Sequence, residues 1–115
     1  QTLRSAVLRM PSDEVLDQVI APLLFTIGSL WHQGLLRPAN EHLATTTIRR
    51  VLVWMSDLAV SDSSAPLVVV GTPAHQMHEI GAMLAATTAA SSGWRVAYLG
   101  PNLPADELAR AVRFA

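Results

Sequence analysis

The hydrophobic pattern of this chain changes at residues 61–66, and that change constrains the fold more than any other feature. Before this segment, apolar residues recur every three or four positions, which indicates amphipathic helices. After it, short apolar runs alternate with helical patterns, which indicates parallel strands joined by helices. Because residues 61–66 are polar and rich in helix breakers, we interpret them as a linker between a helical bundle at 1–60 and an α/β domain at 67–115.

The helical part is predicted to contain the end of one helix, at 1–10, and two long helices, at 13–33 and 40–59. The apolar seams of the long pair are Leu16, Ile20, Leu23, Ile27 and Leu30, and Ala44, Ile48, Val51, Met55 and Leu58. Pro22 lies inside the first pattern and should kink that helix. A short turn with Gly34 and Pro38 joins the two helices, so they should pack antiparallel.

The α/β part is predicted to contain buried parallel strands at 67–70 and 94–99, with helices at 78–92 and from 104 onward. This order indicates a Rossmann-like or flavodoxin-like fold with a right-handed crossover. Two strands do not make a stable doubly wound sheet. We therefore expect 67–115 to be the first half of a larger domain, truncated in this chain.

Composition excludes several classes of protein. The formal net charge is -1 and every basic residue is Arg, so no basic stripe is present to neutralise nucleic-acid phosphates. The absence of Cys excludes disulfides and thiolate metal sites. No uninterrupted apolar run approaches the roughly 18–20 residues of a membrane span, and we expect no membrane partner.

The segment Gly71–Gly81 is the first candidate site, because it follows an apolar strand and precedes a helical pattern. Ligands of open α/β sheets bind at such carboxyl ends of strands. The segment lacks the spacing of a phosphate-binding loop. It contains two imidazoles, His75 and His78, which are either metal ligands or solvated loop residues.

A second candidate site lies where the two long helices meet their connecting turn. Trp31 and His32 fall in the last turn of one helix, and Glu41 and His42 in the first turn of the next. Because the helices should be antiparallel neighbours, these four residues are expected to meet at one end of the bundle. The alternative is a capped bundle end, with Trp31 as a lid and Glu41 favoured by the helix dipole.

Both candidate sites carry motifs that resemble one family. Trp31, nine intervening residues and Glu41-His42 resemble the signature of light-sensing, cobalamin-binding regulators of the CarH/LitR type in the MerR family. The segment 76–81, Gln-Met-His-Glu-Ile-Gly, resembles the D/E-x-H-x-x-G motif of base-off/His-on cobalamin domains. Residues 93–104 also look like the second strand and loop of such modules, so the resemblance covers nearly the whole chain.

The resemblance implies specific roles for these residues. His78 would be the lower axial cobalt ligand, and the displaced nucleotide tail would pass near Gly81. Trp31 would stack over the upper axial group, typically 5′-deoxyadenosyl, with Glu41 and His42 lining the same space. Light would break the cobalt–carbon bond and rearrange the bundle.

The resemblance also implies a biological setting. The protein would be a cytoplasmic homo-oligomer that binds adenosylcobalamin or another cobalamin. It would bind DNA only through a separate helix-turn-helix domain that this chain lacks.

Two residues modify this expectation. Gln76 replaces the usual carboxylate two positions before the ligand His, which predicts weaker lower-face ligation because Gln supplies no charge. His32 is the candidate upper ligand once the adenosyl group has left, since a neutral imidazole binds cobalt well.

Other functions stay open at the level of sequence. They are a corrinoid carrier domain of a methyltransferase system and a structural module whose histidines are incidental. We expect the chain not to be an enzyme; metal hydrolase chemistry is weakly supported, because no H-E-x-x-H pattern is present.

Overall fold

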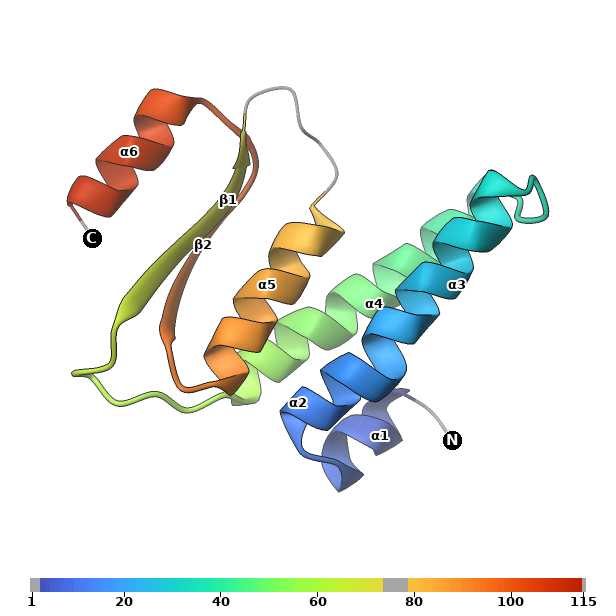
Figure 1. The fold of residues 1–115 in the computed structure, drawn as a ribbon, viewed down its shortest axis with the longest axis horizontal. Coiled ribbons are helices and arrows are strands. Elements are labelled where there is room, and N and C mark those ends of the chain that lie inside the picture. Colours follow the sequence, from blue (N-terminus) through green and yellow to red (C-terminus); the bar gives the residue numbers. More distant parts are fainter. Residues whose placement is uncertain (1–2, 74–78, 115) are drawn as a thin grey trace. The chain divides into compact units, whose positions relative to one another are not determined.

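A computed structural model describes residues 3–73 and 79–114. The chain divides into two compact units, Gln1–Met55 and Ser56–Ala115. The first is helical, and the second holds a parallel two-stranded sheet with helices (Figure 1). The predicted fold class, a helical bundle followed by a Rossmann-like α/β arrangement, is confirmed.

The first unit consists of consecutive helices. They are α1 (Leu3–Arg9), α2 (Ser12–Val15), the π-helical segment η1 (Leu16–Ile20), α3 (Ala21–His32) and α4 (Pro38–Leu58), whose last turn extends past the unit boundary. The segments α2, η1 and α3 form one uninterrupted helical run, which agrees with the predicted helix at 13–33. The chain then reverses, so that α4 runs antiparallel to α3 (Figure 1).

The irregularity expected at Pro22 takes the form of η1. Proline has no N–H to donate to the preceding turn, and its ring crowds the carbonyl four residues earlier. Widening the preceding turn to π-helical bonding relieves both problems. The backbone stays in the right-handed helical region on both sides, at Val15 and Ala21. The helix therefore continues through this local change in hydrogen-bond pattern.

The turn after α3 has the hydrogen bonds of a Schellman motif. Gly34 takes a φ of 72°, and its N–H donates to the carbonyl of Trp31 at 3.0 Å. Leu35 N–H donates to the carbonyl of Leu30 at 3.0 Å. Pro38, predicted to lie in the turn, is instead the first residue of α4, where a missing N–H costs nothing.

The buried residues of the first unit lie away from this turn. They are Val15, Leu16, Ile20, Ile48, Val51, Leu52 and Met55. No residue of α3 is buried, and the predicted seam residues Leu23, Ile27 and Leu30 are half-buried. The apolar surface of α3 therefore stays partly open toward the turn.

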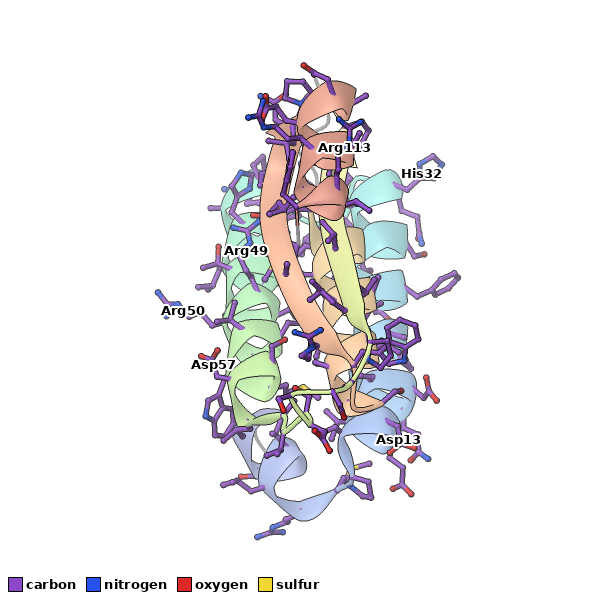
Figure 2. All side chains as sticks on the ribbon, turned by 90° about the vertical axis from the view of Figure 1, so that its left-hand side faces the viewer. Asp13, His32, Arg49, Arg50, Asp57 and Arg113 are labelled. Atoms are coloured by element: carbon purple, nitrogen blue, oxygen red, sulfur yellow. The ribbon has the colours of Figure 1, made fainter. Side chains whose placement is uncertain are left out.

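The second unit alternates strands and helices: β1 (Leu67–Pro73), α5 (Ile80–Ser91), β2 (Arg95–Leu103) and α6 (Ala105–Arg113). The strands are parallel, with Leu67 paired to Arg95 and Val70 to Tyr98. Helix α5 packs on both strands and α6 on β1, from opposite faces of the sheet (Figures 1 and 2). The residues at 67–70, predicted to be buried, are half-buried, because each strand has one neighbour.

Both strands are longer than predicted. Residues 71–73 and 100–103 were predicted as loops, but they belong to β1 and β2. The pairing shifts register after Val70 and again after Gly71, which lets the ladder continue. Gly100 and Asn102 take positive φ values of 85° and 60° there. Asn102 N–H also donates to the Thr72 hydroxyl at 2.9 Å.

The predicted linker contains a local side-chain turn. The Asp62 carboxylate accepts hydrogen bonds from the backbone N–H and the hydroxyl of Ser64, both at 3.0 Å. These bonds favour the charged carboxylate and lower the pKa of Asp62 below its usual value. The segment is therefore a structured turn rather than a bare spacer.

Within the described residues, one helical run, Ser12–His32, is long and apolar enough to cross a membrane by length and composition alone. The apolar residues of this run are not continuous, because Asp17, Gln18 and Thr26 interrupt them. Buried core helices of soluble proteins and signal sequences meet the same criterion, and one such helix is weak evidence. Its length and composition therefore do not assign it to a membrane.

Candidate functional site

The first candidate site lies at the turn between α3 and α4. Trp31 and His32 end α3, and Glu41 and His42 lie in the first turn of α4. The Trp31 side chain is 48% exposed although it is the largest apolar group of the helix. Glu41 is half-buried, whereas His32 and His42 are exposed. The sequence prediction that these residues lie at the same end of the helix pair agrees with this placement.

Glu41 and His42 form the direct contact of this site. Nδ1 of His42 lies 2.7 Å from Oε2 of Glu41 and 2.8 Å from the carbonyl oxygen of Pro38. Both partners are acceptors, so Nδ1 carries the proton and donates. In the neutral ring, Nε2 then keeps its lone pair and can accept a hydrogen bond or bind a metal. The two acceptors thus orient the imidazole and select its tautomer.

His32 and Trp31 do not join this contact. None of the hydrogen bonds or ion pairs of the described residues links either of them to Glu41 or His42. Figure 2 shows the His32 side chain pointing outward from α3. Among the described residues, the structure therefore brings Glu41 and His42 together but does not join Trp31 or His32 to them.

An open apolar surface adjoins Trp31. Leu23, Ile27 and Leu30 are spaced four and three residues apart, so they share one face of α3, and all three are half-buried. Together with Trp31 they offer apolar and aromatic surface on α3, while the polar Glu41–His42 pair lies in the first turn of α4. Such a combination suits a large flat ligand that has both apolar and hydrogen-bonding groups.

The second candidate site follows β1. The predicted residues His75, Gln76 and His78 lie outside the described residues, and their roles stay predictions. The described chain resumes at Glu79, which precedes the first turn of α5. A Cβ built on Gly81 would meet no atom of the described residues within 4 Å. The described part of the chain therefore leaves room beside this glycine, as close approach of a ligand requires.

A contact at this site was missed by the sequence analysis. The Tyr98 hydroxyl donates to Oε2 of Glu79 at 2.6 Å. It joins β2 to the residue before α5 across 19 positions of sequence. The available signal was that Tyr98 is the sole tyrosine of the chain and falls at the end of a predicted strand.

Comparison with known proteins shows which family the first unit resembles. A family described as B12 binding domain matches residues 1–54. Residues 1–54 are therefore similar to this family. The matched range is almost the whole of the first compact unit, which carries Trp31, Glu41 and His42.

Two curated relatives extend the similarity into the second unit. The chain is 36% identical over 103 residues to the HTH-type transcriptional repressor CarH of Myxococcus xanthus, covering 90% of this chain and 34% of that protein. It is 32% identical over 92 residues to the repressor CarA of the same organism, covering 80% and 30%. The chain thus spans about a third of the length of these relatives, which are transcriptional repressors and not enzymes.

The residues of the first unit fit a cobalamin ligand. The exposed Trp31 and the half-buried face of α3 supply apolar contact area for a macrocycle. The Glu41 carboxylate and the Nε2 atom of His42 supply acceptors for a polar upper group. Among the described residues, no group of three or more His, Asp or Glu side chains could hold a metal by itself.

Proposed function

We propose that this chain is the cobalamin-sensing domain of a transcriptional regulator, that it binds adenosylcobalamin, and that light is its signal. The observation that carries the proposal is the exposed Trp31 at the end of α3 and the Glu41–His42 pair at the start of α4, on a unit that the B12 binding domain family matches. Similarity to two repressors supports the regulatory setting.

Each residue of the first unit has a distinct task in this proposal. Trp31 covers the upper axial group and excludes water from it. Glu41 accepts hydrogen bonds from ribose hydroxyls or from the adenine amino group. His42, oriented by Glu41 and Pro38, presents Nε2 to the same space. The adenosyl form of the cofactor supplies a cobalt–carbon bond that light can break.

The second unit would hold the lower face. His78 would ligate cobalt, Gln76 would orient its ring, and Gly81 would leave room for the nucleotide tail. His32 would supply an imidazole to the upper face once the adenosyl group has left. DNA binding would reside in a separate helix-turn-helix domain, and the whole regulator would act as a cytoplasmic homo-oligomer of the MerR family.

The test is an absorption spectrum recorded in the dark with adenosylcobalamin and again after green light. The proposal predicts a dark complex that changes irreversibly on illumination and is lost in His78→Ala. His75→Ala is the matched control, because it removes the other imidazole of the same segment. Equal affinity for methylcobalamin and adenosylcobalamin would instead favour a corrinoid carrier domain of a methyltransferase system.

Two further variants test individual residues. His32→Ala should alter the spectrum after light but leave the dark spectrum unchanged; an unchanged spectrum after light means that His32 is not the upper ligand. Gln76→Glu should strengthen lower-face ligation, because a carboxylate raises the basicity of the imidazole it contacts. Equal affinity and equal spectra for Gln76→Glu and wild type would remove that role.

A further inference from the structure

The π-helical segment η1 changes the angular position of every later residue in the helical run Ser12–His32. Its hydrogen bond runs from the Ala21 N–H to the Leu16 carbonyl, five residues earlier. A regular α-helix closes each bond after four residues, so this turn holds one residue more. The residues after η1 are therefore set back by about 100°, the rotation of one helical residue, relative to an uninterrupted α-helix.

Pro22 is the residue that enforces this turn. In a regular helix its ring would crowd the Gln18 carbonyl, and it has no N–H to donate to that carbonyl. The segment η1 itself is packed, because its residues Leu16 and Ile20 are buried. The extra residue thus has a local chemical cause and lies in a well-covered part of the first unit.

The two leucines after Pro22 agree with this rotation. In an uninterrupted α-helix, Leu23 would continue the face of the buried Leu16 and Ile20, since the three are spaced four and three residues apart. Leu24 would then lie about 100° further round the helix. In the structure Leu23 and Leu24 are both half-buried, which is expected if the covered face passes between them.

The same rotation decides which residue at the end of α3 continues the buried face. In an uninterrupted α-helix that residue would be Leu30, and Trp31 would lie about 100° past it. With the extra residue in η1, Trp31 takes the angular position that Leu30 would otherwise have. Trp31 is thereby brought to the face of Leu16 and Ile20, where its side chain is 48% exposed. An aromatic ring that is open on the apolar face of a helix suits contact with a ligand.

We propose that Pro22, through η1, is a positioning residue that sets the angle at which α3 presents Trp31 to the upper axial group of a bound cobalamin. This inference rests on the proposed function and adds a residue to it. Pro22 touches neither the cofactor nor the cobalt–carbon bond in this proposal. It determines which side of α3 carries Trp31.

The first test follows the rotation in the cofactor-free chain. The sequence contains no cysteine, so a single introduced thiol reports the exposure of its own position. In the wild-type background, Leu23→Cys and Leu24→Cys should react with a thiol reagent at similar rates. In the Pro22→Ala background the helix can close regularly, so Leu23→Cys should react more slowly and Leu24→Cys faster. Phe25→Cys is the control and should stay reactive in both backgrounds, because Phe25 is 79% exposed.

The second test measures affinity for adenosylcobalamin by titration. Pro22→Ala should weaken binding as much as Trp31→Ala, by about 10-fold, although circular dichroism shows an intact helix. Pro11→Ala, at the start of α2, is the control for loss of a proline from the same unit and should bind like wild type.

A deletion provides the rescue. Removing Gln18 from the Pro22→Ala variant takes away the extra residue, so a regular α-helix returns Trp31 to its wild-type angle. This variant should recover wild-type affinity, which a merely structural role of Pro22 does not predict. Removing Asp17 instead, which is also exposed in η1, gives a second version of the same rescue.

The outcomes separate this inference from the proposed function. A wild-type chain that binds no adenosylcobalamin overturns the proposed function, and this inference with it. If wild type binds and Pro22→Ala matches it in affinity, only the positioning role fails. Unchanged relative labelling at residues 23 and 24 also overturns it, because η1 then does not depend on Pro22. Two deletions that both leave affinity low overturn it as well, because the angle of Trp31 then does not govern binding.

Discussion

Nδ1 of His42 lies 2.7 Å from the Glu41 carboxylate, the residue immediately before it, and 2.8 Å from the carbonyl oxygen of Pro38. Neighbouring residues on a helix do not face each other, so this contact requires both side chains to turn toward one another. Because both neighbours of Nδ1 are acceptors, the arrangement favours the tautomer with its proton on Nδ1 and leaves Nε2 unprotonated in the neutral ring.

This geometry predicts the tautomer of His42. Nitrogen NMR of the cofactor-free chain should show neutral His42 with its proton on Nδ1. Glu41→Ala should leave the Pro38 carbonyl as the sole acceptor and allow the Nε2–H tautomer to appear. A neutral ring with its proton on Nε2 in wild type would contradict the orientation. His32, exposed on α3, is the internal reference for an imidazole without such partners.

The exposure of Trp31 predicts a functional loss without a loss of stability. Its side chain is 48% exposed, so Trp31→Ala should change the free energy of unfolding by no more than about 0.5 kcal/mol. Affinity for adenosylcobalamin should fall by about 10-fold, since an aromatic stacking contact contributes roughly 0.5–1.5 kcal/mol beyond area burial. Calorimetric titration and thermal unfolding measure the two effects separately.

Phe25 provides the matched control for Trp31. It is also an exposed aromatic residue of α3, at 79% exposure, but it lies two turns from the end of the helix. Phe25→Ala should leave the affinity for adenosylcobalamin unchanged. If both variants lose affinity equally, the effect belongs to the helix as a whole and not to a contact of Trp31.

The sequence predicted helices better than strands, for a physical reason. A helix produces a local period of apolar residues in the sequence. The helices predicted at 13–33 and 40–59 therefore lie close to the observed Ser12–His32 and Pro38–Leu58. Strand length depends on pairing between distant segments. Past Val70 the ladder continues with register shifts, and Gly100 and Asn102 take positive φ values there. A periodic pattern in the sequence does not predict these backbone conformations.

The same distinction holds for the candidate sites, where local patterns predicted residue placement but not side-chain contacts. The placement of Trp31, His32, Glu41 and His42 on either side of one turn followed from helix period and Gly34. The Glu41–His42 contact depends on rotamers, and the Tyr98–Glu79 bond depends on the packing of α5 against β2. Neither can be derived from spacing along the chain. Motif resemblance, not periodicity, predicted the role of His78.

The buried residues of the first unit predict where its stability resides. Leu52 is fully buried on α4, whereas the adjacent Val53 is 47% exposed. Leu52→Ala should destabilise the unit by roughly 2–5 kcal/mol through lost burial and a residual cavity. Val53→Ala should cost no more than about 0.5 kcal/mol. Chemical denaturation monitored by circular dichroism would measure both, and equal costs would contradict the assigned core.

Gly71 and Gly81 predict opposite outcomes for the same substitution. A Cβ on Gly71 would lie 3.0 Å from Cδ2 of Leu108 and 3.3 Å from the carbonyl oxygen of Gly100. Gly71→Ala should therefore destabilise the second unit, by roughly 1–3 kcal/mol as for other overpacked sites. A Cβ on Gly81 meets no described residue within 4 Å, and Gly81→Ala within α5 should raise stability by roughly 0.5 kcal/mol.

Cobalamin binding tests a separate role for Gly81. If the nucleotide tail passes beside Gly81, the methyl group of Gly81→Ala fills space that the tail needs, and affinity should fall although the fold is more stable. Thermal unfolding of the cofactor-free chain and titration with cobalamin measure the two quantities independently. A Gly81→Ala variant that is stabilised and binds cobalamin as tightly as wild type would show that the tail takes another path.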